Sequence, residues 1–323
     1  MKCISTFLCL VALLLLGNTL NAQSLAEAKT MMAEKEYKAA QEMLQELVVT
    51  QPTNSTAILL LGQSLYHQEK FDEAVKRLKP LKSEMKSNAD YFYWLGQSYK
   101  GKLLATDNFL EKGVLSSKVK EYLEKAVVLN PEHTDARESV AFFYFSAPGI
   151  VGGSTKKAFR EVEEIKKRDK KRGLILAGNL YRQKKDYPSA IETYRALIDL
   201  EEENANWYLL LGSAYQLNED YSLAFSFFEQ ALQKNETLAA AYYQYARTGV
   251  LTKKNVDQSI AYMQHFLSLK DKKSYPVASA YWRLGMLYEI KEQQKEAKAA
   301  YQKGLALDPK HEKMQKAMAQ LKQ

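Results

Sequence analysis

The residues that could carry out catalysis are scattered along this chain and form no known motif. Both cysteines, Cys3 and Cys9, lie within the first 22 residues, so the rest of the chain has no thiol. No nucleophile elbow, zinc-protease motif or phosphate-binding glycine loop occurs. The histidines lie far apart, and none has a second histidine or cysteine at metal-ligand spacing: His67, His133, His265 and His311. We therefore expect neither an enzyme nor a metal or other cofactor.

Carboxylates are numerous, but their spacing has a structural explanation. In stretches such as EVEEIKK and EQQKEAK, a lysine follows a glutamate after three or four residues. Residues at this spacing lie on one face of a helix, where they form ion pairs. These carboxylates therefore predict helices rather than acid–base catalysis.

A glycine and tyrosine pattern recurs along nearly the whole chain, in LLLGQSLY, YWLGQSYK, ILAGNLYR, LLLGSAYQ and WRLGMLYE. Gly62 and Gly96 are 34 residues apart, and so are Gly178 and Gly212. A fixed period of this size indicates stacked repeat units rather than one closed globule. Such stacks form long surfaces, and these surfaces usually bind other proteins.

Each repeat unit is predicted to consist of two helices. In the unit from residue 55, Leu61 and Leu65 share a face of the first helix, and Gly62 lets the second helix approach closely. Ala74 and Leu78 follow at helical spacing and form the inner face of the second helix. A proline or a charged residue ends each unit, because proline cannot continue a helix.

This pattern resembles the tetratricopeptide repeat family. The unit from residue 205 carries the signature residues of the family: Tyr208, Leu211, Gly212, Tyr215, Ala224, Phe228 and Ala231. The last unit departs from the signature only at Gly304, where alanine is usual. The resemblance implies an all-α fold, a right-handed superhelical solenoid of helix–turn–helix repeats with a concave groove.

The chain is predicted to have three parts. Residues 1–22 have a basic start, a short apolar core and a small residue at Ala22, as in a secretory signal peptide. Residues 23–309 form an array of about eight tetratricopeptide repeats, and residues 310–323 form a C-terminal capping helix. The predicted repeats begin near Asn21, Ser55, Ala89, Thr134, Lys171, Ala205, Ala239 and Ala278.

Insertions interrupt the period at residues 101–113 and 145–155. Insertions in repeat arrays usually form loops and often contribute to binding faces, so we expect loops at both places. In the second insertion, Ser154 is expected to cap a helix that begins near Thr155.

The signal peptide predicts export across the inner membrane to the periplasm, with association with the outer membrane as an option. No segment after residue 22 is long and apolar enough to span a bilayer. The formal charge of +8 is modest for this length, and export separates the chain from nucleic acid, so no nucleic acid partner is expected. The densest basic run, KKRDKKR at residues 166–172, is interpreted as a solvated helix end; a contact for lipopolysaccharide, an acidic glycan or an acidic protein is the alternative.

The family resemblance also implies which side chains line the groove, at positions two, five, nine, twelve and thirteen of each first helix. The candidates for partner binding at these positions are Tyr66, Tyr93, Gln97, Lys100, Asn179, Arg182, Tyr243, Arg247 and Trp282. Tyrosine, tryptophan, arginine and side-chain amides suit the recognition of an extended peptide. The lysine and asparagine pair with which some family members clamp a C-terminal carboxylate is missing here.

These observations predict a non-enzymatic scaffold or adaptor in the bacterial cell envelope, which binds a peptide or protein partner in its groove. A glycan-binding module is an alternative, because tyrosine and tryptophan rings also stack on sugars. A glycan site would need aromatic rings side by side and flat, whereas a peptide site spaces them along a line. An accessory subunit of an outer-membrane secretion or assembly complex is a further alternative.

Overall fold

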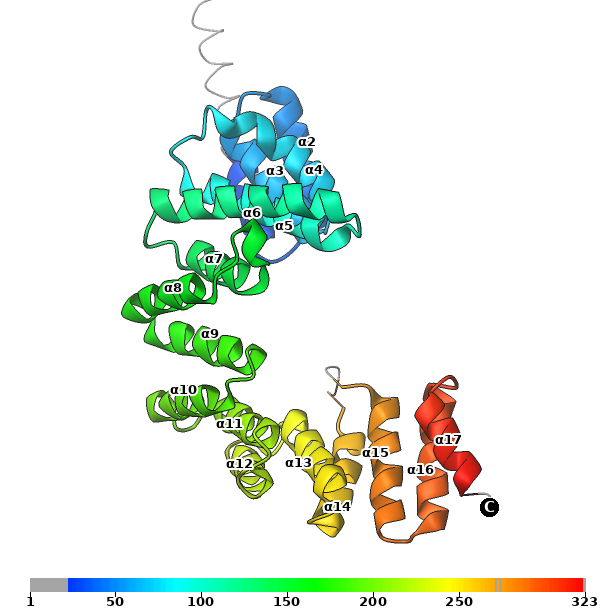
Figure 1. Cartoon of the computed structure of the whole chain (residues 1–323). Coiled ribbons are helices and arrows are strands. Elements are labelled where there is room, and N and C mark those ends of the chain that lie inside the picture. The colour runs from blue at the N-terminus through cyan, green and yellow to red at the C-terminus, as the bar shows by residue number, and fades with distance from the viewer. Residues whose placement is uncertain (1–22, 271, 273–274, 322–323) are drawn as a thin grey trace, which may run out of the picture. The chain divides into compact units, whose positions relative to one another are not determined.

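The computed structural model describes residues 23–270, 272 and 275–321. In this part of the chain every regular element is a helix (Figure 1). The chain divides into two compact units, one that ends at Arg168 and one that begins at Asp169. We call them unit 1 and unit 2. The predicted signal peptide, residues 1–22, lies outside the described residues.

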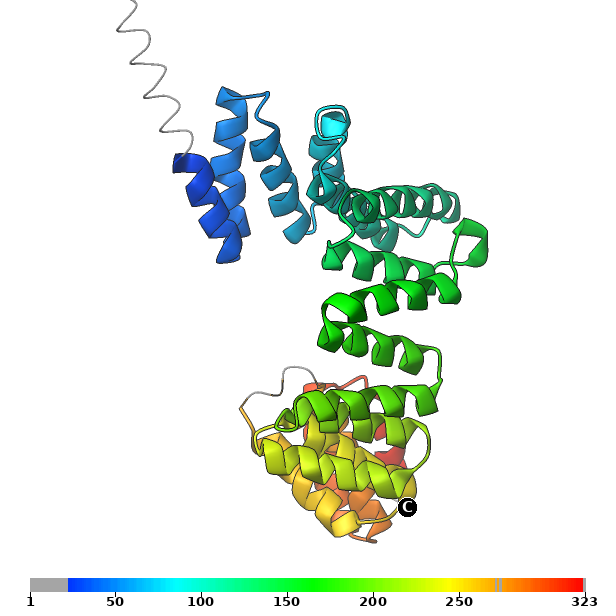
Figure 2. The same cartoon turned by 90° about the vertical axis from the view of Figure 1, so that its left-hand side faces the viewer.

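Unit 1 is a succession of antiparallel helix pairs (Figure 2, blue to green). After a helical segment at 23–33, its elements are α2 (Tyr37–Thr50), α3 (Ser55–His67), α4 (Phe71–Leu78), η1 (Lys79–Lys82), α5 (Ala89–Ala105), α6 (Phe109–Leu129), α7 (Thr134–Ser146), η2 (Gly149–Val151) and α8 (Thr155–Arg168). Consecutive helices pack on each other. In addition, α3, which is the first helix of its pair, contacts α5, which is the first helix of the next pair. First helices therefore lie side by side and share a face.

Unit 2 has the same construction. Its helices are α9 (Lys170–Gln183), α10 (Tyr187–Leu200), α11 (Ala205–Leu217), α12 (Tyr221–Lys234), α13 (Ala239–Thr252), α14 (Val256–Ser268), α15 (Val277–Ile290), α16 (Gln294–Leu307) and α17 (Glu312–Gln320). Helix α13 contacts both α11 and α15, so these first helices also share a face. Helix α17 packs on α16, where Met314 is fully buried. The predicted class, an all-α solenoid of helix–turn–helix repeats, is confirmed.

A recurrent turn joins the two helices in five of the pairs. One residue in it adopts a left-handed backbone, with φ between 59° and 66°: Lys35, Glu69, Lys185, Glu219 and Glu292. The N–H of the following residue then donates to the carbonyl oxygen five residues earlier, at 2.8–2.9 Å. This bond satisfies a carbonyl that the helix end would otherwise leave free. The regular repeats therefore share both their residue pattern and their turn conformation.

Close helix contacts explain the glycines of the repeat pattern. A methyl group added to Gly212 would lie 2.8 Å from the ring of Phe228 and 3.3 Å from the carbonyl oxygen of Ala224. A methyl group on Gly96 would lie 2.8 Å from the side chain of Leu123. Because these neighbours are buried, no solvent space is open to the added atoms.

Replacing Gly212 with leucine is therefore expected to destabilise unit 2 by about 1–3 kcal/mol, because the larger side chain overpacks the contact with Phe228. The midpoint of thermal unfolding, followed by circular dichroism, should fall. Gly113 provides the control, because an added methyl group there meets no atom within 4 Å. Gly113→Ala should stabilise α6 by about 0.5–1 kcal/mol through the higher helix propensity of alanine. A loss of stability in both variants would contradict this packing.

The first insertion is helical, and the expectation of a loop at residues 101–113 is wrong. Helix α5 continues to Ala105 and α6 begins at Phe109, so the inserted residues lengthen both helices. The side chain of Asn108 caps α6 by accepting hydrogen bonds from the backbone N–H groups of Leu110 and Glu111, at 3.0 and 3.2 Å. The connection between the two helices is therefore reduced to residues 106–108.

The second insertion contains a compact loop between α7 and α8, as expected. Gly152 has a φ of 99°, and a side chain on Gly153 would collide with the carbonyl oxygen of Ala147. The hydroxyl of Ser154 accepts a hydrogen bond from the backbone N–H of Lys157 at 3.3 Å, so the predicted helix cap is confirmed.

Candidate functional site

A chain of touching aromatic rings in unit 1 runs from the start of α2 across the first helices α3 and α5 to the start of α7. We call it the aromatic face, and its members are Tyr37, Tyr66, His67, Tyr93, Trp94 and His133. The ring centroids of Tyr37 and His67 are 4.3 Å apart, and those of His67 and Trp94 are 5.3 Å apart. Trp94 then contacts Tyr93 at 5.1 Å, and Tyr93 contacts His133 at 4.8 Å. The rings therefore connect α2, α3, α5 and the start of α7.

Helix ends position the outer members of this face. His133 caps α7, because its Nδ1 accepts a hydrogen bond from the backbone N–H of Ala136 at 3.3 Å. Its Nε2 lies 3.2 Å from a carboxylate oxygen of Asp90, at the start of α5. Tyr66 lies at the end of α3, with its ring 5.4 Å from Trp94, and burial raises the pKa of its hydroxyl.

Polar side chains lie beside the aromatic face, on α5 and α7. Gln97 is 7% exposed, and its Nε2 donates a hydrogen bond to the hydroxyl of Ser139 at 2.9 Å. Its Oε1 has no hydrogen-bond partner among the described residues. Burial raises the pKa of Tyr93, and hydrogen bonding to Gln97 acts in the opposite direction. The site thus contains a buried amide oxygen that accepts no hydrogen bond from the described residues.

Lys100 lies one helical turn further along α5 and is half-buried. Burial lowers the pKa of its ammonium group, and the charge of Glu138 acts in the opposite direction. The structure therefore brings four of the predicted residues of unit 1 to neighbouring positions: Tyr66, Tyr93, Gln97 and Lys100.

Tyr243 is predicted to line the groove, but the structure buries it. It is only 5% exposed, and its ring contacts Phe266 with the centroids 5.3 Å apart. The guanidinium carbon of Arg283 lies 5.1 Å from the centre of the same ring. Phe266 lies on α14 of the same helix pair and Arg283 on α15 of the next pair, so side chains of both pairs cover the ring. Tyr243 is therefore a core residue of unit 2.

Arg247 and Trp282 are half-buried on α13 and α15. Nη1 of Arg247 donates to Oε1 of Gln216 at 3.1 Å and to Oε1 of Gln244 at 3.3 Å. Two cations lie over the ring of Trp282, the guanidinium of Arg283 at 5.2 Å and the ammonium of Lys313 at 5.1 Å from the ring centre.

The remaining predicted residues, Asn179 and Arg182, are half-buried on α9. The charge of Arg182 lowers the pKa of Tyr194, against the larger effect of burial, which raises it. Helix α9 packs on α10, two repeats before α13, so the structure does not bring this pair to the group around Arg247.

Five residues of these groups are not in the predicted set: Tyr37, His67, Trp94, His133 and Arg283. Trp94 directly follows Tyr93, and Arg283 directly follows Trp282, at a helix position that the groove pattern of the family leaves out. For Trp94 and Arg283 the signal that could have found them is the residue type itself, because tryptophan and arginine are among the side chains enriched at interface hot spots.

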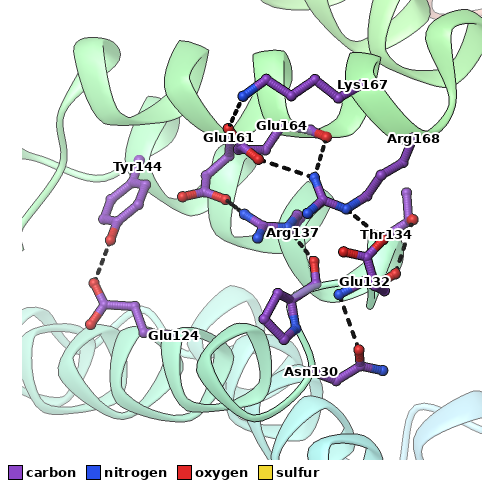
Figure 3. A network of polar contacts seen from close by, with 11 residues as sticks. Glu124, Asn130, Glu132, Thr134, Arg137, Tyr144, Glu161, Glu164, Lys167 and Arg168 are labelled. Atoms are coloured by element: carbon purple, nitrogen blue, oxygen red, sulfur yellow. Dashed lines mark hydrogen bonds and ion pairs between the residues drawn. The ribbon is translucent and has the colours of Figure 1, made fainter.

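Ion pairs surround the densest basic run. In unit 1, Arg168 pairs with Glu132 at 2.8 Å and with Glu164 at 3.1 Å, as Figure 3 shows. Lys167 also pairs with Glu164 at 2.6 Å, and hydrogen bonds from Lys167 and Arg168 lower the pKa of that carboxyl to about 2. In unit 2, Lys171 pairs with Glu201 at 2.7 Å. These pairs agree with the interpretation of the run as a solvated helix end.

Among residues 23–270, 272 and 275–321, no three His, Cys, Asp or Glu side chains are grouped as a metal site would require. In the same residues, no helix combines the length and apolar composition needed to cross a bilayer.

Family models match four ranges of the chain, two of which overlap, so the matches cover three stretches. Models described as a tetratricopeptide repeat match residues 31–95, 205–236 and 278–311, and a model described as a TPR repeat matches residues 178–218. The matched residues include α3 and the first part of α5 from the aromatic face, and α15 from Ala278 onward. The chain belongs to the tetratricopeptide repeat family.

Solved tetratricopeptide repeat structures share this fold over most of the chain. One from Parabacteroides merdae has a TM-score of 0.56 and 15% identity, over 83% of this chain and 98% of its own. The C-terminal part of a repeat protein from Cytophaga hutchinsonii has a TM-score of 0.56 and 17% identity, over 79% and 97%. One from Thermus thermophilus has a TM-score of 0.50 and 14% identity, over 61% and 99%.

No curated protein matches the sequence of this tetratricopeptide repeat chain. At these low identities the structural likeness concerns the fold. The fold is that of a protein–protein interaction scaffold, and proteins of this family typically bind proteins or peptides and are not catalytic.

Proposed function

We propose that this tetratricopeptide repeat protein is a non-enzymatic scaffold that binds an extended segment of a partner protein on the aromatic face of unit 1. The observation that carries the proposal is the continuous chain of rings from Tyr37 to His133, across neighbouring repeats. Aromatic anchors spaced along a line suit the alternating side chains of an extended peptide.

The ring geometry weighs against the glycan alternative. Among the contacts of the aromatic face, the rings of Tyr37 and His67 are nearly parallel, with an interplanar angle of 7°. The contact between Tyr66 and Trp94 is inclined at 66°, and that between Tyr93 and Trp94 at 68°. Edge contacts of this kind do not form the flat platform on which a sugar ring stacks.

The proposed place of action is the bacterial cell envelope, in the periplasm, with the chain from Gln23 as the mature protein. The leader-like pattern of residues 1–22 supports this location. A partner from an outer-membrane secretion or assembly complex is compatible with the same binding face.

The proposed function is tested with the tagged protein, purified from the envelope fraction of its own bacterium. Mass spectrometry identifies the co-purified partner and shows whether the chain begins at Gln23. Binding of that partner is then measured with purified proteins. The double variant His67→Ala, Tyr93→Ala should weaken binding by about 2 kcal/mol or more, because two aromatic anchors are removed.

Phe109→Ala is the matched control, because Phe109 is 85% exposed at the start of α6 and lies outside the aromatic face. It should leave both binding and melting temperature unchanged. Loss of binding in the Phe109 variant, with intact binding in the double variant, would place the partner on the lengthened α5 and α6 and overturn the proposed face. Circular dichroism melts confirm that each variant is folded.

A further inference from the structure

The lengthened helices of unit 1 carry a group of exposed apolar side chains where α5 ends and α6 begins. Its members are Leu104 on α5 and Phe109, Leu110 and Val114 on α6. All four are between 64% and 85% exposed. We call these four residues the apolar tip. Large apolar side chains that are exposed as a group, rather than singly, are typical of interaction surfaces.

The apolar tip belongs to the inserted residues. Helices α5 and α6 contain 17 and 21 residues, whereas α11 and α12 of a regular repeat contain 13 and 14. The side chain of Asn108 caps α6, and the hydroxyl of Thr106 donates a hydrogen bond to Glu111 at 2.6 Å, so the connection between the helices has a defined conformation. Among the described residues, none covers the four side chains, as their exposure shows.

The shape of the tip suits contact with another helix. Phe109, Leu110 and Val114 lie on one face of α6, because their spacing of one and four residues keeps them on the same side. Gly113 lies on this face, one turn after Phe109, and a methyl group added to it would meet no atom within 4 Å. A glycine between large apolar side chains lets the backbone of a second helix approach closely.

Charges of opposite sign flank this face. Because each residue turns by about 100° around the helix axis, Glu111 lies beyond Val114 on one side and Lys112 beyond Phe109 on the other. Two parallel copies of α6, related by a two-fold axis along the helices, therefore bring Glu111 of each copy next to Lys112 of the other. An anionic lipid surface would attract Lys112 but repel Glu111 and the exposed Asp107. The charges favour a second copy of the chain.

The size of the tip fits a reversible dimer. Four such side chains together expose about 500 Å². Two facing tips would remove roughly 1,000 Å² from solvent, and the flanking side chains would bring the total near the ~1,200 Å² at the lower end of specific interfaces. An interface of this size is typical of a weak association.

We propose that the apolar tip is a self-association surface, through which two copies of this chain pair their α6 helices in parallel. The burial of the apolar side chains supplies the stability, and the flanking charges select the orientation. Both copies use the same residues, so the pair closes without further growth. The proposal is independent of the proposed function, because the apolar tip and the aromatic face share no residue. Phe109→Ala therefore weakens the pairing of copies and leaves the binding of one partner segment unchanged.

The test is sedimentation equilibrium of the protein purified from the envelope fraction, over a range of concentrations. The unmodified protein should show a monomer–dimer equilibrium. Leu110→Glu should weaken dimerisation by about tenfold or more, because it places two carboxylates in the apolar contact. Glutamate suits the first turn of α6, so this variant should keep its helix. Val49→Glu is the matched control, because Val49 is exposed at the end of α2, and it should change dimerisation by less than about twofold.

Charge exchange tests the parallel arrangement. Glu111→Lys and Lys112→Glu each bring like charges together in both symmetry-related contacts, so each should weaken dimerisation by about threefold or more. The double variant exchanges the two charges and should restore dimerisation to within about twofold of the unmodified protein. Circular dichroism checks the helix content of each variant. A double variant weaker than both single variants would overturn the parallel arrangement.

A protein that stays monomeric at all concentrations would overturn the self-association surface, and so would equal effects of Leu110→Glu and Val49→Glu. Co-sedimentation with vesicles of equal parts phosphatidylglycerol and phosphatidylethanolamine tests the other occupant. If the monomer binds these vesicles and Leu110→Glu abolishes that binding, the tip contacts lipid and the pairing is wrong. None of these measurements involves the aromatic face, so their failure leaves the proposed function untouched.

Discussion

Replacing Tyr243 with alanine is expected to destabilise unit 2 by about 3–5 kcal/mol, as for other large aromatic residues in a core. The side chain is 5% exposed and contacts Phe266, and the guanidinium of Arg283 lies over its ring. Alanine would leave a cavity between α13, α14 and α15 and remove the surface against which Arg283 rests. Urea unfolding followed by circular dichroism should show a lower midpoint.

Tyr243→Phe is the control, because it retains the ring and removes only the hydroxyl group. It should change the free energy of unfolding by about 1 kcal/mol or less. Since the chain has two compact units, the unfolding curve should be analysed for two transitions. An alanine variant as stable as the unmodified protein would contradict the burial of Tyr243 and return it to the set of partner-binding residues.

Replacing Arg137 with alanine is expected to destabilise unit 1 by about 3 kcal/mol, because it leaves the carboxylate of Glu161 without its counter-charge. The two side chains are only 10% and 17% exposed, and their pair is 2.6 Å long. Nε of Arg137 also donates to the carbonyl oxygen of Pro131 at 2.7 Å, which holds the turn before α7 against α8. Thermal melts and urea titrations both measure this loss.

Arg168→Ala provides the comparison for that variant. Its partner Glu132 is 69% exposed, so water replaces the lost ion pair, and the cost should be about 1 kcal/mol or less. The double variant Arg137→Met, Glu161→Leu should recover most of the lost stability, because no unpaired charge remains. If the double variant is as unstable as Arg137→Ala, the loss of stability comes from the missing hydrogen bond between Arg137 and the carbonyl oxygen of Pro131, and not from the unpaired charge of Glu161.

Local and periodic features could be predicted from the sequence. Gly212 and Phe228 lie at signature positions, and their contact depends only on how one helix pair closes. The same pattern occurs in successive units, so the repeat fold follows from residues close together in sequence. The inserted residues follow no such pattern. Whether Leu110 and Glu111 form a loop or a helix depends on the cap supplied by Asn108, and the period does not contain this information.

For the candidate site, the sequence alone determined the class of fold, the helix pairs and the residue types on the first helices. Tertiary structure decided which of these side chains are buried and which lie together. The ring of Tyr243 on α13 is covered by the guanidinium of Arg283 only because α13 packs beside α15 of the next repeat. The physical reason is that burial and charge compensation depend on side chains contributed by neighbouring repeats. The sequence of one helix determines which residue types lie on its face, whereas the neighbouring helices determine which side chains that face contacts.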